Sequence, residues 1–139
     1  MFKHIMAPVD LAHLDRLESA LETTADIAKH YGAKVTYVSA SNATPGSIAR
    51  NPEEFREMLA AFAKEQGEKA ELETSSHPLI LHDEAVDLDN ALVHAAEELN
   101  ADMVIMASHK PGFVDHFWSS NGGNVARHSN ASVLIVRED

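Results

Sequence analysis

Short apolar stretches rich in β-branched residues alternate along this chain with longer stretches of helical periodicity. The apolar stretches are residues 2–9, 35–40, 78–81, 103–106 and 133–136. They are apolar at consecutive positions, so both faces of the strands they form must be covered. Strands of this kind separated by helices predict an α/β fold: a five-stranded parallel sheet with helices on both faces.

Three helices are predicted between these strands. The first covers residues 14–31 and ends before Gly32, because glycine commonly follows the last residue of a helix. The second begins at Pro52, a favoured first helical residue, and the third follows Asp87, a candidate N-cap. Residues 42–51 contain a proline and a glycine and are predicted to form a loop.

Composition narrows the class of protein further. The 139 residues suit a single domain, 1–139, and the absence of cysteine excludes disulfides and thiol chemistry. A net charge of −11 opposes binding to nucleic acid, which requires basic side chains against the phosphates. No apolar stretch approaches the ~20 residues that span a membrane, and the first residues do not resemble a signal peptide. We therefore expect a cytoplasmic protein without membrane insertion.

The ends of the predicted strands carry the candidate binding residues. Open parallel sheets bind ligands at the carboxyl ends of their strands, where the strand order reverses. In this sequence those ends are Pro8-Val9-Asp10, Ala40, and Ala107-Ser108-His109-Lys110. Asp10 is either a ligand-binding carboxylate or the cap of a turn. His109 is likewise either a donor to a bound phosphate or a turn cap.

At these residues the chain resembles the universal stress proteins over essentially its whole length. The resemblance rests on the opening strand that ends in Asp10 and on the closing block, residues 103–136. That block contains Ala107-Ser108-His109-Lys110-Pro111, Ser119-Ser120-Asn121 and Ser132-Val133-Leu134-Ile135-Val136. The first of these segments is most similar to the Ser-His-Arg-Pro phosphate loop of short bacterial members. The resemblance implies a Rossmann-like open sandwich of the adenine nucleotide alpha hydrolase-like type.

The resemblance also implies a site for ATP or AMP, with or without Mg²⁺. Nucleotide-binding members carry Gly-x-x-Gly, a longer spacer, and then Gly followed by Ser or Thr. In this chain Ala107, Lys110 and Ser119 replace the three glycines, and Ser120 keeps the hydroxyl position. Lys110 offers a charge to the phosphates, whereas each added Cβ narrows the approach of the backbone. The implied nucleotide-binding residues are Pro8, Val9, Asp10, Ala40, Met106, Ala107, Ser108, His109, Lys110, Ser119, Ser120 and Asn121.

Two functions remain open at this point. The first is a regulatory protein that binds an adenine nucleotide and signals to a protein partner through a homodimer, which the resemblance places along residues 132–136. The alternative is an adaptor of the same fold that has lost the nucleotide and acts by protein contacts alone. A third class is an enzyme that hydrolyses ATP or uses an adenylate, which only a second substrate site would favour. No such site and no nucleophile with a general base are recognisable in the sequence, so we expect slow ATP hydrolysis at most. His109, Asp115 and His116 fit no metal-ligand spacing, and no metal site is predicted.

Overall fold

The computed structural model describes residues 1–42, 51–81, 88–109 and 122–138. The strands are β1 (His4–Pro8), β2 (Lys34–Asn42), β3 (Thr74–Leu81), β4 (Met103–His109) and β5 (Ser132–Glu138). The helices are the 3-10 helix η1 (Leu11–Arg16) and the α-helices α1 (Glu18–Tyr31), α2 (Pro52–Ala70), α3 (Leu88–Glu98) and α4 (Gly122–His128).

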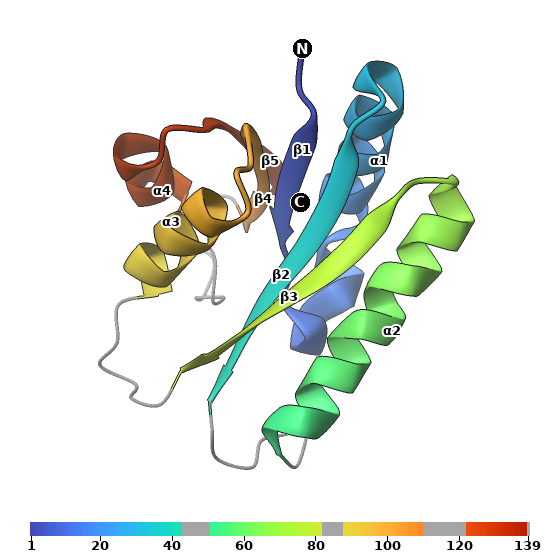
Figure 1. Ribbon diagram of the computed structural model, residues 1–139, viewed down its shortest axis with the longest axis vertical. Coiled ribbons are helices and arrows are strands. Elements are labelled where there is room, and N and C mark those ends of the chain that lie inside the picture. Colours follow the sequence, from blue (N-terminus) through green and yellow to red (C-terminus); the bar gives the residue numbers. More distant parts are fainter. Residues whose placement is uncertain (43–50, 82–87, 110–121, 139) are drawn as a thin grey trace.

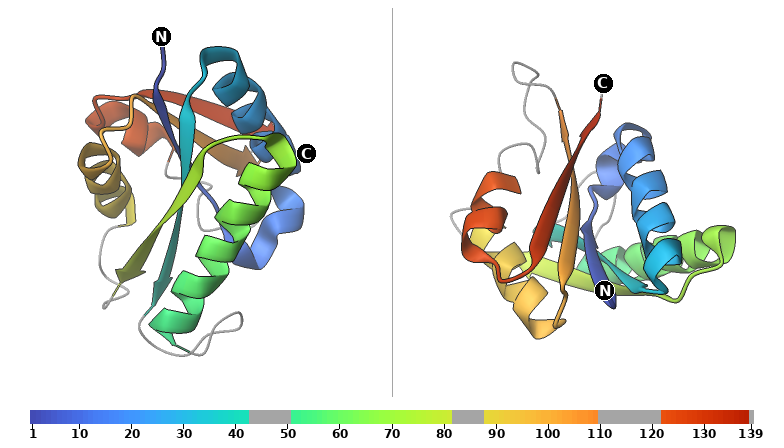
Figure 2. Two further views of the ribbon diagram at one scale, coloured as in Figure 1. Left: turned by 45° about the vertical axis from the view of Figure 1, so that its right-hand side comes forward. Right: turned by 90° about the horizontal axis from the view of Figure 1, so that it is seen from above.

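The five strands form one parallel sheet in the order β3-β2-β1-β4-β5. Helices α1 and α2 cover one face of the sheet, and α3 and α4 cover the other (Figure 1). The same two layers are visible in both views of Figure 2. The predicted architecture, a five-stranded parallel sheet with helices on both faces, is confirmed.

Two apolar clusters, one on each face of the sheet, form the core. The cluster under α1 and α2 contains Ile5 and Tyr37, and the Tyr37 ring lies edge-to-face with Phe62, with 5.3 Å between ring centroids. The cluster under α3 and α4 contains Met6 and Val104. Successive residues of a strand point to opposite faces, so Ile5 and Met6 fall in different clusters. This is why the strands are apolar at consecutive positions.

The first predicted helix is wrong at its start. Instead of one helix over residues 14–31, η1 comes first and α1 begins only at Glu18. Leu17 between them has φ −114° and ψ 7°, outside the α-helical region. The Asp10 side chain accepts a hydrogen bond from the Ala12 N–H, which stabilises a tight turn at this point. The spacing of apolar residues alone does not reveal that a capped 3-10 turn replaces the first turn of the predicted α-helix.

The predicted number of strands is correct, but β1 is shorter than the predicted 2–9 and the other four strands are longer than expected. β3 begins at Thr74, four residues before the predicted start at Pro78. It lies at an edge of the sheet, so its first residues can be polar without losing their place in the strand. The second helix begins at Pro52 as predicted, with the Asn51 side chain as its cap. Asp87 and most of the predicted loop, residues 43–50, lie outside the described residues.

Candidate functional site

The strand order changes direction at β1. The chain builds β2 and β3 on one side of β1, and later adds β4 and β5 on the other. β1 stays paired with β2 to its end, where the Val9 N–H donates to the Val38 carbonyl at 2.8 Å. Its pairing with β4 within the described residues goes only as far as Met6 with Val104. The carboxyl ends of β1 and β4 therefore flank the position where open α/β sheets bind ligands.

Asp10 lies at this edge, directly after β1. One carboxylate oxygen, Oδ1, accepts from the Ala12 N–H at 3.0 Å, and the other, Oδ2, lies 2.8 Å from Nδ1 of His13. The side chain of Asp10 is 13% exposed. The structure thus shows the turn-capping role of Asp10. A carboxylate has about four lone-pair positions, so these two contacts leave capacity for further donors such as ribose hydroxyls.

The other strand-end residues are distributed between the two faces of the sheet. Ala40 is half-buried and packs on the cluster under α3 and α4, which also contains the fully buried Met106. Ala107 is 7% exposed and belongs to the opposite cluster, under α1 and α2. Ser108 is also buried. Met106 is therefore a core residue on the face that Ala40 also packs against.

The remaining candidates are His109 and the predicted phosphate-binding residues that follow it. His109 is the last residue of β4, where its backbone is in register with Glu138 of β5. The predicted phosphate-binding residues Lys110, Ser119, Ser120 and Asn121 lie outside the described residues. The described structure therefore covers the predicted site residues from Pro8 to His109, and the predicted phosphate loop that follows β4 lies outside it.

Two residues at this edge were not predicted. His13 pairs with Asp10, and the spacing Asp10-x-x-His13 is a signal that could have been read from the sequence. Glu138 is 7% exposed, and its Oε1 accepts a hydrogen bond from the Ala20 N–H at 2.8 Å. Nothing in the local sequence indicates this second contact, because the two residues are far apart along the chain.

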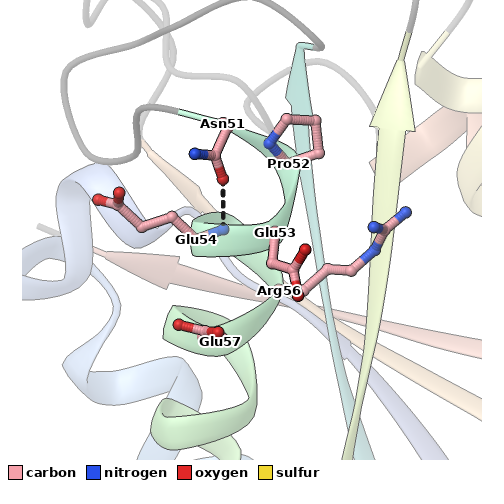
Figure 3. A pocket seen from close by; sticks show the side chains of 6 residues that line it. All are labelled: Asn51, Pro52, Glu53, Glu54, Arg56 and Glu57. Atoms are coloured by element: carbon pink, nitrogen blue, oxygen red, sulfur yellow. Dashed lines mark hydrogen bonds between the residues drawn. The ribbon is translucent and has the colours of Figure 1, made fainter.

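A surface pocket of about 600 Å³ lies at the start of α2 (Figure 3). Its lining residues are Asn51, Pro52, Glu53, Glu54, Arg56 and Glu57. The Arg56 side chain extends away from Glu54 and Glu57, as Figure 3 shows. Three glutamates against one arginine oppose an anionic ligand, so this pocket does not suit the phosphates of a nucleotide.

Across residues 1–42, 51–81, 88–109 and 122–138, no three His, Asp or Glu side chains come together as a metal site. Among the helices in those ranges, none has the length and apolar character required to cross a membrane.

Known proteins resemble this chain in sequence, and solved structures resemble it in fold. The sequence matches the model of the universal stress protein family over residues 1–137. Universal stress protein G of Shigella flexneri is 29% identical over 146 residues, which cover 99% of this chain and 100% of that protein.

Two solved structures show the same fold. One is a universal stress protein in complex with cAMP, with a TM-score of 0.69 and 21% identity, covering 99% of this chain and 98% of that one. The other is the universal stress protein of Archaeoglobus fulgidus in complex with dAMP. It has a TM-score of 0.67 and 22% identity, covering 96% of this chain and 97% of that one.

Proposed function

Because the chain belongs to the universal stress protein family, we propose that it is a single-domain regulatory protein that binds an adenine nucleotide, ATP or AMP. The observation that carries this proposal is a parallel sheet whose strand order reverses at β1, so that the ends of β1, β2 and β4 lie at one edge beside the point of reversal. The solved relatives in complex with cAMP and dAMP support an adenine nucleotide as the ligand. We place the protein in the cytoplasm.

The proposed site has a nucleoside end and a phosphate end. At the nucleoside end, Asp10 accepts hydrogen bonds from the ribose, and Ala40 forms part of the wall beside the adenine. At the phosphate end, Lys110 supplies a positive charge, and Ser119, Ser120 and Asn121 supply hydroxyl, amide and backbone N–H donors. Mg²⁺ would accompany a polyphosphate there. These assignments follow from the family resemblance and from the placement of the strand ends.

Ala107 replaces the first glycine of the family's nucleotide-binding motif, and its burial indicates whether the added methyl group obstructs a ligand. Its exposure is only 7%, and it packs within the cluster under α1 and α2. A methyl group in that position contacts the core, so it takes little room from a ligand at the sheet edge. The replacement at Ala107 is therefore compatible with nucleotide binding. The steric argument against binding then rests mainly on Lys110 and Ser119.

We propose that the protein signals as a homodimer joined along β5. β3 and β5 are the edge strands of the sheet. β3 contains Pro78, which has no N–H to offer and so weakens strand pairing at that edge. β5 contains no proline and exposes the large apolar side chain of Ile135. This edge is therefore better suited to pair with a second copy or with a protein partner.

The second candidate function is an adaptor that works without a nucleotide. The replacement of three family glycines favours it, because glycine lets backbone amides approach phosphates closely. In this case the dimer and an unknown protein partner carry the function alone. Nucleic acid is not a proposed partner of either form, given the charge of −11. Catalysis beyond slow ATP hydrolysis is not proposed.

Native mass spectrometry of freshly purified protein tests the choice between these functions. We expect a fraction of the protein to carry the mass of an adenine nucleotide, and calorimetry on nucleotide-free protein to detect ATP binding. Absence of heat with both ATP and AMP, in protein shown to be folded and free of nucleotide, would favour the adaptor.

A further inference from the structure

Both oxygens of the Asp10 carboxylate are held by the turn that follows β1. Oδ1 accepts from the Ala12 N–H at 3.0 Å, and Oδ2 lies 2.8 Å from Nδ1 of His13. An ionised carboxylate only accepts hydrogen bonds, so Nδ1 of His13 carries the proton in this contact. A single contact would let the carboxylate turn about its bond to Cβ, because that torsion is soft. The second contact, from His13, fixes the plane of the carboxylate.

His13 reaches back to Asp10 through its backbone as well as its ring. The His13 N–H donates to the Asp10 carbonyl at 3.0 Å, which closes the first turn of η1. The backbone of His13 then departs from helical geometry, with φ −136° and ψ 44°. The ring thus belongs to a turn that a backbone hydrogen bond already closes. A turn this short keeps the ring near the carboxylate at little cost in chain entropy.

The contact between Asp10 and His13 contributes little to the stability of the fold. The side chain of His13 is 43% exposed, and water screens charge pairs that have an exposed partner. The side chain of Asp10 is 13% exposed, so a ligand can still reach it. Asp10 directly follows β1, at the edge of the sheet where the nucleotide is proposed to bind. The main effect of His13 on Asp10 is therefore on the direction of its carboxylate.

The fixed carboxylate suits a ligand with two neighbouring hydroxyl groups. Each carboxylate oxygen has about two lone-pair positions. The Ala12 N–H takes one position on Oδ1, and the His13 ring takes one on Oδ2, so each oxygen keeps one position for a further donor. The two hydroxyls of a ribose lie on adjacent carbons and can donate to the two oxygens together. A 2′-deoxyribose offers only one of them.

We infer that His13 is a positioning residue that fixes the Asp10 carboxylate for both hydroxyls of a ribose, and so makes the site prefer ribonucleotides to 2′-deoxyribonucleotides. This inference rests on the proposed nucleotide-binding function and adds the sugar that the site selects. Asp10 touches the sugar, and His13 acts through Asp10. Without His13 the carboxylate can turn, and it no longer meets both hydroxyls at once. Loss of His13 therefore weakens the ribonucleotide more than the deoxyribonucleotide.

The test compares ATP with 2′-deoxy-ATP by calorimetric titration of nucleotide-free protein. The two ligands differ by one hydroxyl group, so the contacts of the base and the phosphates cancel in the ratio of their dissociation constants. We expect the parent protein to bind ATP roughly tenfold more tightly, as for one hydrogen bond to a charged group. His13→Ala should reduce this preference to less than about twofold, mainly by weakening ATP.

Two further variants separate the hydrogen bond of His13 from the bulk of its ring. His13→Asn keeps an N–H at the δ position of the side chain, as in Nδ1 of histidine, and should keep most of the preference for ATP. His13→Phe keeps a planar ring without an N–H, so it should lose the preference, and it decides the matter if His13→Ala does not fold. The matched control is His30→Ala, which changes an exposed histidine in the last turn of α1 and should keep the parent ratio.

The outcomes distinguish this inference from the proposed function. If the parent protein binds neither nucleotide, the proposed function fails and the role of His13 fails with it. If the parent binds both nucleotides equally well, nucleotide binding stands and the selection of ribose is overturned. A parent-like ratio in the folded His13→Ala and His13→Phe variants would overturn the positioning role, even if both ligands bound more weakly. A ratio in His13→Asn as low as in His13→Ala would also overturn it, because the N–H at this position would then have no effect.

Discussion

Asp10 and Lys110 are assigned to opposite ends of the nucleotide, so their substitution should have different effects. Asp10→Ala should weaken ATP and adenosine alike, because both ligands carry the same ribose and base. Lys110→Ala should weaken ATP by about 1–3 kcal/mol more than adenosine, through loss of a charged hydrogen bond to phosphate. Calorimetric titration of both ligands measures the difference.

Two further variants separate the possible causes of a weaker affinity at these positions. Asp10→Asn keeps an oxygen for the Ala12 N–H, and so separates loss of the turn from loss of the carboxylate. Lys110→Gly removes the charge but restores the family residue. Tighter ATP binding by Lys110→Gly would mean that the lysine obstructs the site, and would contradict its assigned role.

His4 of β1 is a buried histidine whose hydrogen bonds define which ring nitrogen carries the proton in the neutral form. Nδ1 lies 2.8 Å from the Leu99 carbonyl, which only accepts, so Nδ1 carries the proton. Nε2 then accepts from the Thr36 hydroxyl at 2.7 Å. Burial, with a smaller contribution from Lys34, lowers the pKa of His4, although the Leu99 carbonyl, Asp102 and Glu73 oppose the shift.

This lowered pKa predicts a pH-dependent stability. The unfolded chain takes up a proton on His4 near pH 6.5, whereas the folded protein resists it until a lower pH. The contribution of His4 is therefore present above about pH 6.5 and is lost as the pH falls through the folded pKa. Urea unfolding at pH 7.5, 6.5 and 5.5 should show a smaller pH dependence in His4→Gln than in the parent. An unchanged pH dependence would contradict this account.

At the scale of elements, α2 packs closely on β3 at Gly67, where there is no side chain between them. A Cβ on Gly67 would lie 2.5 Å from the Thr74 hydroxyl, which already donates to the Ala63 carbonyl at 2.7 Å. Gly67→Ala should therefore destabilise the protein by about 1–2 kcal/mol, even though alanine favours a helix by up to ~1 kcal/mol. Chemical denaturation gives the change in the free energy of unfolding.

Gly123 of α4 is the matched control. Among the described residues, no atom lies within 4 Å of a Cβ built at this position, so Gly123→Ala should gain helix propensity and stabilise the protein slightly. If Gly67→Ala were also stabilising, the close contact between α2 and β3 would not be a constraint on this fold.

The elements differ in how well their sequence predicts them. β1 and β4 have consecutive apolar residues because both faces are buried, and this pattern is visible in any single stretch. The polar start of β3 is a strand only because β2 pairs with it from Val35 onward. At Leu17 the 3-10 helix η1 ends, with the Leu17 N–H bonded to the Leu14 carbonyl. The first turn of α1 receives its acceptor from the distant Glu138. Periodicity therefore predicts the layers, but it does not predict contacts between distant residues.

In the candidate site too, the placement of strand ends could be predicted from the sequence, whereas contacts between distant residues could not. The strand ends at Asp10, Ala40 and Ala107 follow from the order of elements, because all parallel strands end at one edge. The spacing Asp10-x-x-His13 is a local signal for that pair, which the geometry of η1 brings into contact. The contact between Glu138 and Ala20 joins residues far apart in the sequence, so no local motif indicates it.

At the scale of the whole molecule, the open edge of β5 predicts the oligomeric state. Ile135 is 36% exposed, whereas Leu134 packs against the core, so Ile135→Lys disturbs the edge with less effect on the fold. The parent should sediment as a dimer at micromolar concentration, and Ile135→Lys should shift it toward monomer. Tyr31→Lys changes another exposed apolar residue, on α1, and should remain dimeric. A parent that is monomeric throughout this range would contradict the proposed dimer.

The central position of β1 has a consequence for the order in which the protein can assemble during its synthesis. β1, β2 and β3, with α1 and α2 over one face, can pair as soon as they have left the ribosome. The other edge of β1 must wait for β4, and Met6 on the opposite face must wait for α3. The nascent first half thus exposes an unpaired strand and an apolar face, both of which favour aggregation. We expect this interval of translation to be the one in which the chain most needs protection by chaperones.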